Sequence, residues 1–383
     1  MHLQLKNIGQ ITNADIRFGD LTVFVGPQAT GKTIALEFLK LAVDLPAIQD
    51  TMNRYGIDWS GQLPGFFDVY FGEGMRGLWR DDQSEVWWRG RQLPLSSLLA
   101  RSPRHRAGSV FYIPAQRVLA LRDGWPQPFS AYSSDVPFVL REFSETLRVL
   151  MGQFKVGKTL FPEQRRLSKE FRGLLKQNIF AGFRLVLQTR FMQMRLVLKD
   201  GDQSLPFMVW SAGQREFVPL LLGLYWLMLP SSTGRRGEIK WVVLEELEMG
   251  LHPRAIDVLI LMTWELIARG YRVCLSTHSS QVIEVLWALR HLQLNGASGQ
   301  ALLGVFKVPS TAPMRNLAET VLTKSVKVYY FDSATGATSD ISELDVDSKD
   351  AGGDGWGGLI ESSDRANSAV AMAVANAERQ LRT

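Results

Sequence analysis

The stretch that decides the fold reads Gly26-Pro27-Gln28-Ala29-Thr30-Gly31-Lys32-Thr33, and it matches the phosphate-binding pattern GxxxxGK[ST]. It follows an apolar run, Leu21–Val25, that is typical of a buried strand, and it opens a helical pattern of apolar residues. In this context the glycines let backbone N–H groups surround an anion, and the helix start adds partial positive charge. We expect Lys32 to reach the β- and γ-phosphates of a nucleotide and the Thr33 hydroxyl to ligate Mg²⁺.

The same pattern occurs a second time, at Gly152–Thr159, with the sequence GQFKVGKT. The segment before it, Val139–Met151, has helical spacing and ends in no strand. Pro162 follows closely and argues against a helix that continues from the loop. We therefore expect this second copy to be a basic turn between helices and not a second nucleotide site.

Length and composition limit the class of protein. A chain of 383 residues can bury a large core and form one elaborated domain or two. The longest apolar run, Phe217–Leu229, is too short for a membrane span and indicates a buried helix, and the first residues lack a signal-peptide pattern. The single cysteine, Cys274, excludes an intramolecular disulfide and fits a reducing, cytoplasmic setting.

Short buried strands alternate with helices along the chain. Val110–Ile113, Val242–Leu244 and Val273–Thr277 are expected strands, and Arg254–Ala268 is an expected helix between the last two. This alternation predicts the α/β class with a mainly parallel sheet. Residues 136–181 are expected to be mainly helical, followed by a strand pair at 183–188 and 194–198. No heptad repeat occurs between residues 118 and 210, which argues against a coiled-coil arm.

Two acids stand at the end of the expected strand Val242–Leu244. A carboxylate at this position can hold Mg²⁺, directly or through water, and we assign this role to Glu245. An adjacent carboxylate can orient and deprotonate the attacking water, and we assign Glu246 as this general base.

Two further polar residues follow expected strands. His278, in Thr277-His278-Ser279, would point into the crevice that holds the phosphate loop, where it can hydrogen-bond the γ-phosphate or the attacking water. Gln116 follows the strand Val110–Ile113 and could touch Mg²⁺ or the water. A simple loop glutamine is the alternative interpretation of Gln116.

A second anion-binding turn is expected at Ser211-Ala212-Gly213-Gln214, where a serine and a glycine open an apolar helix. The loop at Gly26 already surrounds the phosphates of one nucleotide. A second nest is therefore explained if Ser211, Gly213 and Gln214 serve the nucleotide of another subunit.

In this order the motifs resemble those of the ABC-type ATPases. Leu5–Gly9, Glu245–Glu248 and Leu251–Pro253 are similar to the RecF-like and OLD-like AAA branch, which includes ATPase subunits of anti-phage defence systems. The resemblance implies an ABC-ATPase-like P-loop core. We expect that core at residues 1–45, 108–120 and 183–331, with a Trp/Gly-rich insert at 46–107, a helical lobe at 121–182, and an acidic flexible tail with a short helix at 332–383.

The family implies ATP and Mg²⁺ as cofactors and a head-to-head homodimer or higher homo-oligomer. Each nucleotide would be held by residues of one chain, with Thr33, Gln116 and Glu245 at the metal. Ser211, Gly213 and Gln214 of the other chain would close the γ-phosphate. Hydrolysis to ADP and phosphate would reopen the dimer. Four positions depart from the commonest family pattern without removing a chemical role: Gln28, Ala212, Glu245 and Leu247.

The leading functional hypothesis is a cytoplasmic, ATP-hydrolysing sensor or regulator of a separate effector protein, a nuclease or toxin, in anti-phage defence. No fused nuclease domain is recognisable, and Asp345-Val346-Asp347 is interpreted as a solvated turn. The Trp-rich insert and the helical segment 136–181 are the expected partner elements.

The alternative is a RecF-like ATPase of repair or recombination that binds double-stranded DNA. Basic clusters at 101–106 and 165–176 motivate it, although a solvated helix face is the simpler interpretation of them. An ATPase subunit of a membrane transporter is disfavoured, because no membrane-domain coupling segment is recognisable. A non-hydrolysing nucleotide-gated scaffold is the fourth hypothesis.

Overall fold

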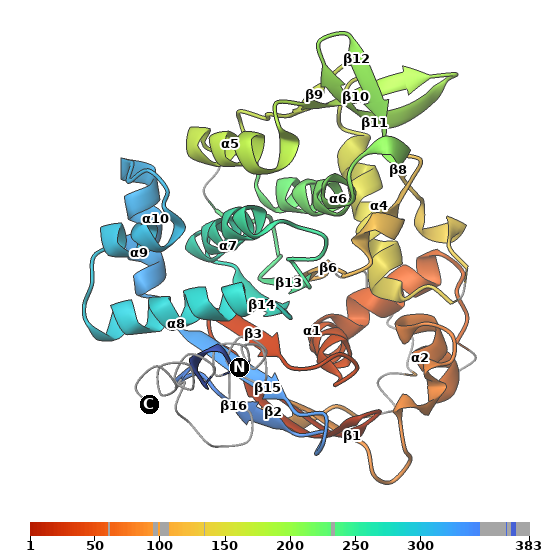
Figure 1. Cartoon of the computed structure of the whole chain (residues 1–383). Helices are drawn as coiled ribbons and strands as arrows, with labels where there is room; N and C mark the ends of the chain where they lie inside the picture. The colour runs from red at the N-terminus through yellow and green to blue at the C-terminus, as the bar shows by residue number, and fades with distance from the viewer. Residues whose placement is uncertain are drawn as a thin grey trace, which may run out of the picture.

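A six-stranded sheet forms the centre of the molecule (Figure 1). The computed structural model describes residues 1–59, 62–94, 99, 107–133, 135–230, 234–344, 365 and 369–372. The strand order is β16-β15-β3-β14-β13-β6, and every neighbouring pair is parallel except β15 with β16. This sheet confirms the α/β class. Its strands are β3 (Leu21–Val25), β6 (Val110–Ile113), β13 (Trp241–Glu245), β14 (Arg272–Ser276), β15 (Val326–Phe331) and β16 (Thr338–Asp340).

The central sheet is buried on both faces, which explains why its strands are nearly continuous apolar runs. Along β13, Val242 and Leu244 face one hydrophobic core, whereas Trp241 and Val243 face another. Each core therefore takes alternate side chains of the same strand, as the two-residue period of a strand requires.

Helices pack on the first face and build the upper part of the molecule in Figure 1. The expected helix at 217–229 begins earlier, at Ala212, because the Ser211 side chain caps it. Among the described residues, none of the helices is long and apolar enough to cross a bilayer. The helices on this face are α4 (Phe138–Met151), α5 (Lys169–Leu175), α6 (Ala212–Leu227), α7 (Pro253–Ala268), α8 (Ser280–Leu294), α9 (Gly299–Phe306) and α10 (Ala312–Leu322).

The second face packs against helix α1 and an antiparallel sheet. In that sheet β1 pairs with β2 and with β4 from the 46–107 segment. Trp88 of β4 contacts Trp241 of the central sheet. The segment 46–107 thus adds to the second core. The elements are β1 (His2–Ile8), β2 (Ile11–Arg17), α1 (Lys32–Arg54), α2 (Leu63–Phe71), η1 (Met75–Leu78), β4 (Glu85–Trp88) and β5 (Arg91–Gln92).

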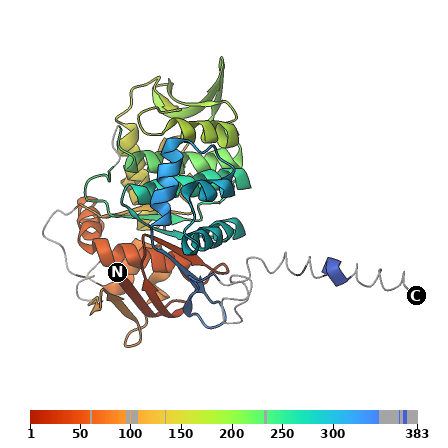
Figure 2. The same ribbon diagram turned by 90° about the vertical axis from the view of Figure 1, so that its left-hand side faces the viewer.

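A third sheet, β12-β11-β10-β9, lies at the end of the molecule opposite β1 and β2 (Figure 2). It confirms the strand pair predicted near 183–198. It also shows that the second copy of the phosphate-loop pattern lies between α4 and β9, not between two helices. The sheet and its neighbours are β9 (Thr159–Phe161), β10 (Arg184–Arg190), β11 (Gln193–Asp200), β12 (Gln203–Pro206), β7 (Leu121–Arg122), β8 (Trp125–Pro126), η2 (Arg117–Ala120), η3 (Phe129–Ala131), η4 (Lys176–Phe180) and η5 (Phe207–Val209).

Three sequence predictions concern residues outside those that the structure describes. They are the basic cluster at 101–106, the turn Asp345-Val346-Asp347 and most of the short C-terminal helix.

Candidate nucleotide-binding site

The loop 26–31 joins β3 to α1 in a conformation that requires glycine at both ends. Gly26 has φ +134°, and a Cβ there would lie 2.4 Å from the carbonyl oxygen of Phe331. Gly31 has φ +96°, and a Cβ there would lie 2.5 Å from Cγ1 of Ile11. The backbone therefore passes too close to its neighbours for any side chain. Between the glycines, Pro27, Gln28 and Ala29 are exposed and Thr30 is buried.

The Lys32 side chain folds back over this loop. Its Nζ donates to the carbonyl oxygens of Gly26 at 2.8 Å and Pro27 at 2.6 Å. Burial lowers the pKa of Lys32 to about 8, although Glu246 and Glu248 act in the opposite direction. The ammonium group is thus held by neutral carbonyl dipoles, which an anionic phosphate can replace.

The end of β13 places Glu245 deep in the site. Its Oε2 accepts from the backbone N–H of Ala115 at 3.0 Å. Its Oε1 is buried without a hydrogen-bond partner among the described residues. Burial raises the pKa of Glu245, while Ala115 and then the Thr33 hydroxyl lower it. A buried, half-satisfied carboxylate of this kind calls for a cation or a proton.

Glu246 has a backbone conformation that is rare for a side-chain-bearing residue, with φ +40°. Its N–H donates to the carbonyl oxygen of Ser276 at 3.0 Å, which fixes the turn against β14. Its Oε1 lies 3.6 Å from Nε2 of His278. His278, then Lys32 and Arg117, lower the pKa of Glu246, so this carboxylate is ionised at neutral pH. Strain of this kind concentrates at functional sites.

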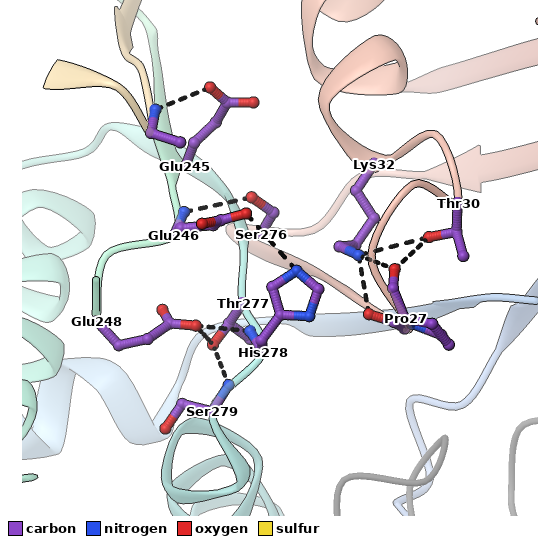
Figure 3. Close-up of polar contacts among 12 residues, drawn as sticks. Pro27, Thr30, Lys32, Glu245, Glu246, Glu248, Ser276, Thr277, His278 and Ser279 are labelled. Carbon is purple, nitrogen blue, oxygen red and sulfur yellow. Dashed lines mark hydrogen bonds and ion pairs between the residues drawn. The ribbon is translucent and has the colours of Figure 1, made fainter. Parts of the chain in front are cut away.

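Glu248 holds the histidine loop in place (Figure 3). Its Oε1 accepts from the Thr277 hydroxyl at 2.8 Å and from the backbone N–H of His278 at 2.6 Å. The Thr277 hydroxyl in turn accepts from the N–H of Ser279 at 3.0 Å. The sequence analysis assigned no role to Glu248, although this third acidic residue, two positions after the pair Glu245-Glu246, was visible in the sequence.

Arg117 ties three motifs together behind the site. It is fully buried, and its guanidinium donates to the carbonyl oxygens of Glu216, Glu245 and Glu246 at 3.0–3.3 Å. Gln116 itself is exposed at the start of η2. Arg117 was also missed, although an arginine directly after the glutamine loop was visible in the sequence.

The residues Ser211, Gly213 and Gln214 open helix α6. The Ser211 hydroxyl accepts from the N–H of Gln214 at 3.3 Å, and the Gln214 side chain accepts from the N–H of Ser211 at 3.1 Å, which completes a capping box. A Cβ at Gly213 would lie 3.0 Å from the carbonyl oxygen of Gly250. No hydrogen bond in the described part of the chain joins these three residues to the loop 26–31.

The remaining site residues lie at or after the carboxyl ends of four neighbouring strands. The sheet order β3-β14-β13-β6 brings Lys32, His278, the acidic pair and Gln116 to adjacent carboxyl ends. Figure 3 shows Glu246 and His278 directed toward the side of the Lys32 loop, whereas the Glu245 carboxylate turns toward the backbone N–H of Ala115.

The residues around Glu245 fit a magnesium ion. Mg²⁺ prefers oxygen ligands and binds proteins through one or two carboxylates plus substrate phosphates. The unpartnered Oε1 of Glu245 and the nearby Thr33 hydroxyl supply such oxygens. Among the described residues, no group of three or more His, Cys, Asp and Glu side chains forms an all-protein metal site. A magnesium ion here would take waters or substrate phosphates as its further ligands.

Low-identity likenesses to solved structures were found. They include an SMC head bound to the C-winged helix domain of ScpA, at 10% identity over 89% of this chain and 96% of that chain, with a TM-score of 0.40. The SMC head domain from Thermotoga maritima is 13% identical over 74% and 90%, with a TM-score of 0.33. A bacterial ABC transporter cassette, solved as a dimer, is 11% identical over 88% and 98%, with a TM-score of 0.35.

A family match covers the motifs downstream of the phosphate loop. No curated protein matches the chain. Residues 94–284 match the family described as "AAA domain, putative AbiEii toxin, Type IV TA system". This range includes Gln116, the helix start at Ser211, the acidic pair and His278. Residues 94–284 therefore carry an AAA-type domain.

Proposed function

We propose that the chain binds ATP with Mg²⁺ and hydrolyses it to ADP and phosphate. The observation that supports this most is the convergence of Lys32, Glu246 and His278 at neighbouring strand ends. On nucleotide binding, Lys32 would exchange the carbonyls of Gly26 and Pro27 for the β- and γ-phosphates.

Thr33 and Glu245 would hold the magnesium ion, with Gln116 on its open side. When bound, Mg²⁺ neutralises charge on the β- and γ-phosphates. Lys32 and Thr33 are the first two residues of α1, so one helix positions both the residue for the phosphates and the residue for the metal.

Glu246 would act as the general base. Its ionised carboxylate accepts a proton as water attacks the γ-phosphorus and the bond to the ADP oxygen breaks. His278 would hydrogen-bond the γ-phosphate or the water, held by Glu248. Arg117 fixes the backbone carbonyls of both acids and so positions them.

Turnover and binding, measured on the same Glu246→Gln protein, test the proposal. We expect ATP binding to persist and phosphate release to stop, because Gln cannot take the proton. Unchanged turnover would show that another group is the base. Competition between ATP and GTP for the site tests whether the protein prefers adenine to guanine nucleotides.

The second copy of the chain would complete the site in a head-to-head dimer. Ser211, Gly213 and Gln214 lie at a helix start, where free N–H groups and the helix dipole favour an anion. Sedimentation of Glu246→Gln with and without ATP tests this. Dimers that need ATP and disappear in Ser211→Arg would support it; an ATP-independent monomer would contradict it.

The proposed biological role is regulation of a separate effector, a nuclease or toxin, in anti-phage defence. The description of the matched family names a toxin of a type IV toxin–antitoxin system, and we extend a related role to this chain. Plaque counts on host cells test it. Cells with the Lys32→Ala protein should lose protection that the natural chain gives; equal plaque counts would contradict the role.

Direct binding of double-stranded DNA is the second candidate. Arg165, in the turn before α5, is exposed, as are Lys169 at the start of α5 and Lys176 at the start of η4. Arg166 is buried and donates to the carbonyl oxygens of Tyr225 and Met228. Arg166 is therefore a packing residue and not part of a DNA surface. Charge reversal at the three exposed positions should abolish salt-sensitive duplex binding if this candidate is correct.

A further inference from the structure

The sheet β12-β11-β10-β9 lies at the end of the molecule farthest from β1 and β2 (Figure 2). Several large apolar side chains of this sheet and of η5 are exposed. Phe191 is 86% exposed and Met192 is 96% exposed, at the tip of the hairpin formed by β10 and β11. Met194, Met208 and Val209 add further exposed apolar surface nearby. We call these five residues the hairpin patch. Phe191, Met192, Met194 and Met208 line one hollow, and exposed apolar side chains gathered in this way often mark an interaction site.

The hairpin tip has a backbone conformation that does not suit its sequence. Arg190 pairs with Gln193, so the turn contains just Phe191 and Met192. Their φ angles are +48° and +62°. A two-residue turn with two positive φ angles favours Asn-Gly, and bulky residues there are strained. Because Asn-Gly would adopt this turn with less backbone strain, the presence of Phe191 and Met192 indicates a function at the surface.

The base of the hairpin is firmly held while its tip projects. The N–H of Leu196 in β11 donates to the carbonyl oxygen of Gly124 at 3.0 Å, which joins the hairpin to the turn between β7 and β8. A hollow of about 750 Å³ lies between these segments. A rigid base lets the tip engage a partner without a large ordering cost.

The chemistry of this hollow favours a protein partner. Its lining is mostly arginine, methionine and aromatic side chains, among them Arg122, Trp125, Arg190, Phe191, Met192 and Arg195. These residue types are enriched at protein–protein interfaces, and lysine, which is common in phosphate-backbone contacts, does not line the hollow. Asp123 is the acidic residue that lines the hollow, beside three arginines.

The charge of the region indicates the kind of partner. Residues 152–210 contain eleven lysines and arginines against four acids, although the whole chain has a net charge of +5. A matching surface would carry carboxylates around an apolar pocket that receives Phe191 and Met192. By contrast, Trp59 of the 46–107 segment is buried and Trp88 packs on Trp241, so tryptophans of that segment serve packing.

The hairpin patch is connected to the expected dimer face. Met208 and Val209 belong to η5, which precedes Ser211 at the start of α6. Trp210 lies between η5 and Ser211. Its backbone N–H donates to the carbonyl oxygen of Phe207 at 3.2 Å, and its indole N–H donates to the carbonyl oxygen of Leu205 at 2.9 Å. A shift of the α6 start on nucleotide closure would therefore move part of the patch.

We propose that the hairpin patch, with Arg122, Arg190 and Arg195, is the docking surface for the effector protein. The effector would present an apolar pocket rimmed by carboxylates. This inference rests on the proposed function as a regulator of a separate protein. It adds the surface and the chemistry of the partner.

Site-specific photocrosslinking tests the docking surface. The full chain with Glu246→Gln would carry a photoreactive phenylalanine at position 192, or at position 294 as a control, in its native host. Leu294 is also exposed but lies at the end of α8. We expect crosslinks from position 192, and not from 294, to one other protein at a peptide that contains Asp or Glu.

A turn replacement supplies the second measurement. Phe191→Asn with Met192→Gly inserts the residues that this turn prefers, so the fold should persist. Because this variant lacks the crosslinking position, its readout is co-purification of the protein that position 192 identified. That recovery should fall at least about tenfold, because two apolar anchors are lost. In the otherwise natural chain, the replacement should leave ATP turnover within about twofold, because neither residue lies in the nucleotide site.

Other outcomes would overturn the inference. Crosslinks to a second copy of this chain would make the hairpin patch a dimer surface, and crosslinks to nucleic acid would assign it to DNA. Equal crosslinking from positions 192 and 294, or unchanged recovery after the turn replacement, would remove the docking role. Normal ATP turnover with no crosslink rejects the docking surface alone, whereas a crosslinked partner without turnover rejects the ATPase proposal alone.

Discussion

The two copies of the GxxxxGK[ST] pattern have the same letters and different structures. Gly26–Thr33 follows β3 and opens α1, whereas Gly152–Thr159 follows α4 and runs into β9. Lys32 is buried and donates to backbone carbonyls of its own loop, whereas Lys158 is half exposed and pairs with Glu163 at 2.9 Å. The comparison teaches that the letters alone do not determine the structure, because a strand leads into the loop and a helix begins at the lysine in the first copy and not in the second.

Glutamate 246 gives the largest expected effect. We predict that Glu246→Gln lowers ATP turnover by about 10³-fold, since removal of a general base costs on the order of 10²–10⁴. Steady-state phosphate release measures it. Lys158 of the second copy pairs with Glu163 and not with the end of β13, so any substantial turnover that persists in this variant would break the comparison and suggest a second site.

The two lysines should differ almost as strongly. Lys32→Ala should weaken ATP binding by about 100-fold, because a charged donor to the phosphates is lost. Lys158→Ala should leave affinity within about twofold, because its partner is Glu163 and not a nucleotide. Titration calorimetry on both variants checks this, and equal losses would contradict the assignment of the loop at Gly26.

Sequence predicted the parts of the site that local patterns determine. Strands β3, β6, β13 and β14 are short apolar runs followed by polar residues, so their carboxyl ends and site residues were visible. The pairing of β4 with β1 depends on contacts between residues such as Leu3 and Trp88, which no local pattern shows. Arg117 was missed for a similar reason, since its three carbonyl partners come from distant segments.

The first glycines of the two copies should respond with opposite sign. Gly26→Ala should lower the free energy of unfolding by about 2 kcal/mol, because the new Cβ meets the Phe331 carbonyl at positive φ. Gly152 has φ −62°, and a Cβ there would meet its nearest atom at 3.4 Å. Gly152→Ala should therefore raise stability by about 0.5 kcal/mol. Urea unfolding measures both, and shifts of equal sign would contradict the comparison.

The pH dependence of ATP binding should follow Lys32. Burial lowers the pKa of Lys32 to about 8 in the nucleotide-free protein, although Glu246 and Glu248 act in the opposite direction. The ammonium group therefore loses its proton above that pH. Affinity should then fall by up to about tenfold between pH 8 and 9. Free energy of unfolding changes in the opposite direction: burial of the charge costs stability below pH 8, and that cost is relieved as pH rises toward 10.5.

Matched arginine variants isolate this effect. Lys32→Arg keeps its charge throughout this range and should show no loss of affinity above pH 8 that is specific to the protein. Lys158→Arg should reproduce the pH profile of the natural chain. A profile that is the same in all three proteins would show that Lys32 does not control it.

The ion pair of the second copy should have the smallest effect. Lys158 is 44% exposed, so Glu163→Gln should lower stability by at most about 1 kcal/mol, and less in high salt. Thermal unfolding at low and high salt measures it, and a double-mutant cycle with Lys158→Ala separates the pair from other contacts of Glu163. A large, salt-independent coupling would mean that the pair is structural. A small, salt-sensitive coupling would mean that solvent screens the exposed Lys158, whereas Lys32 is buried and held by carbonyls that a phosphate can displace.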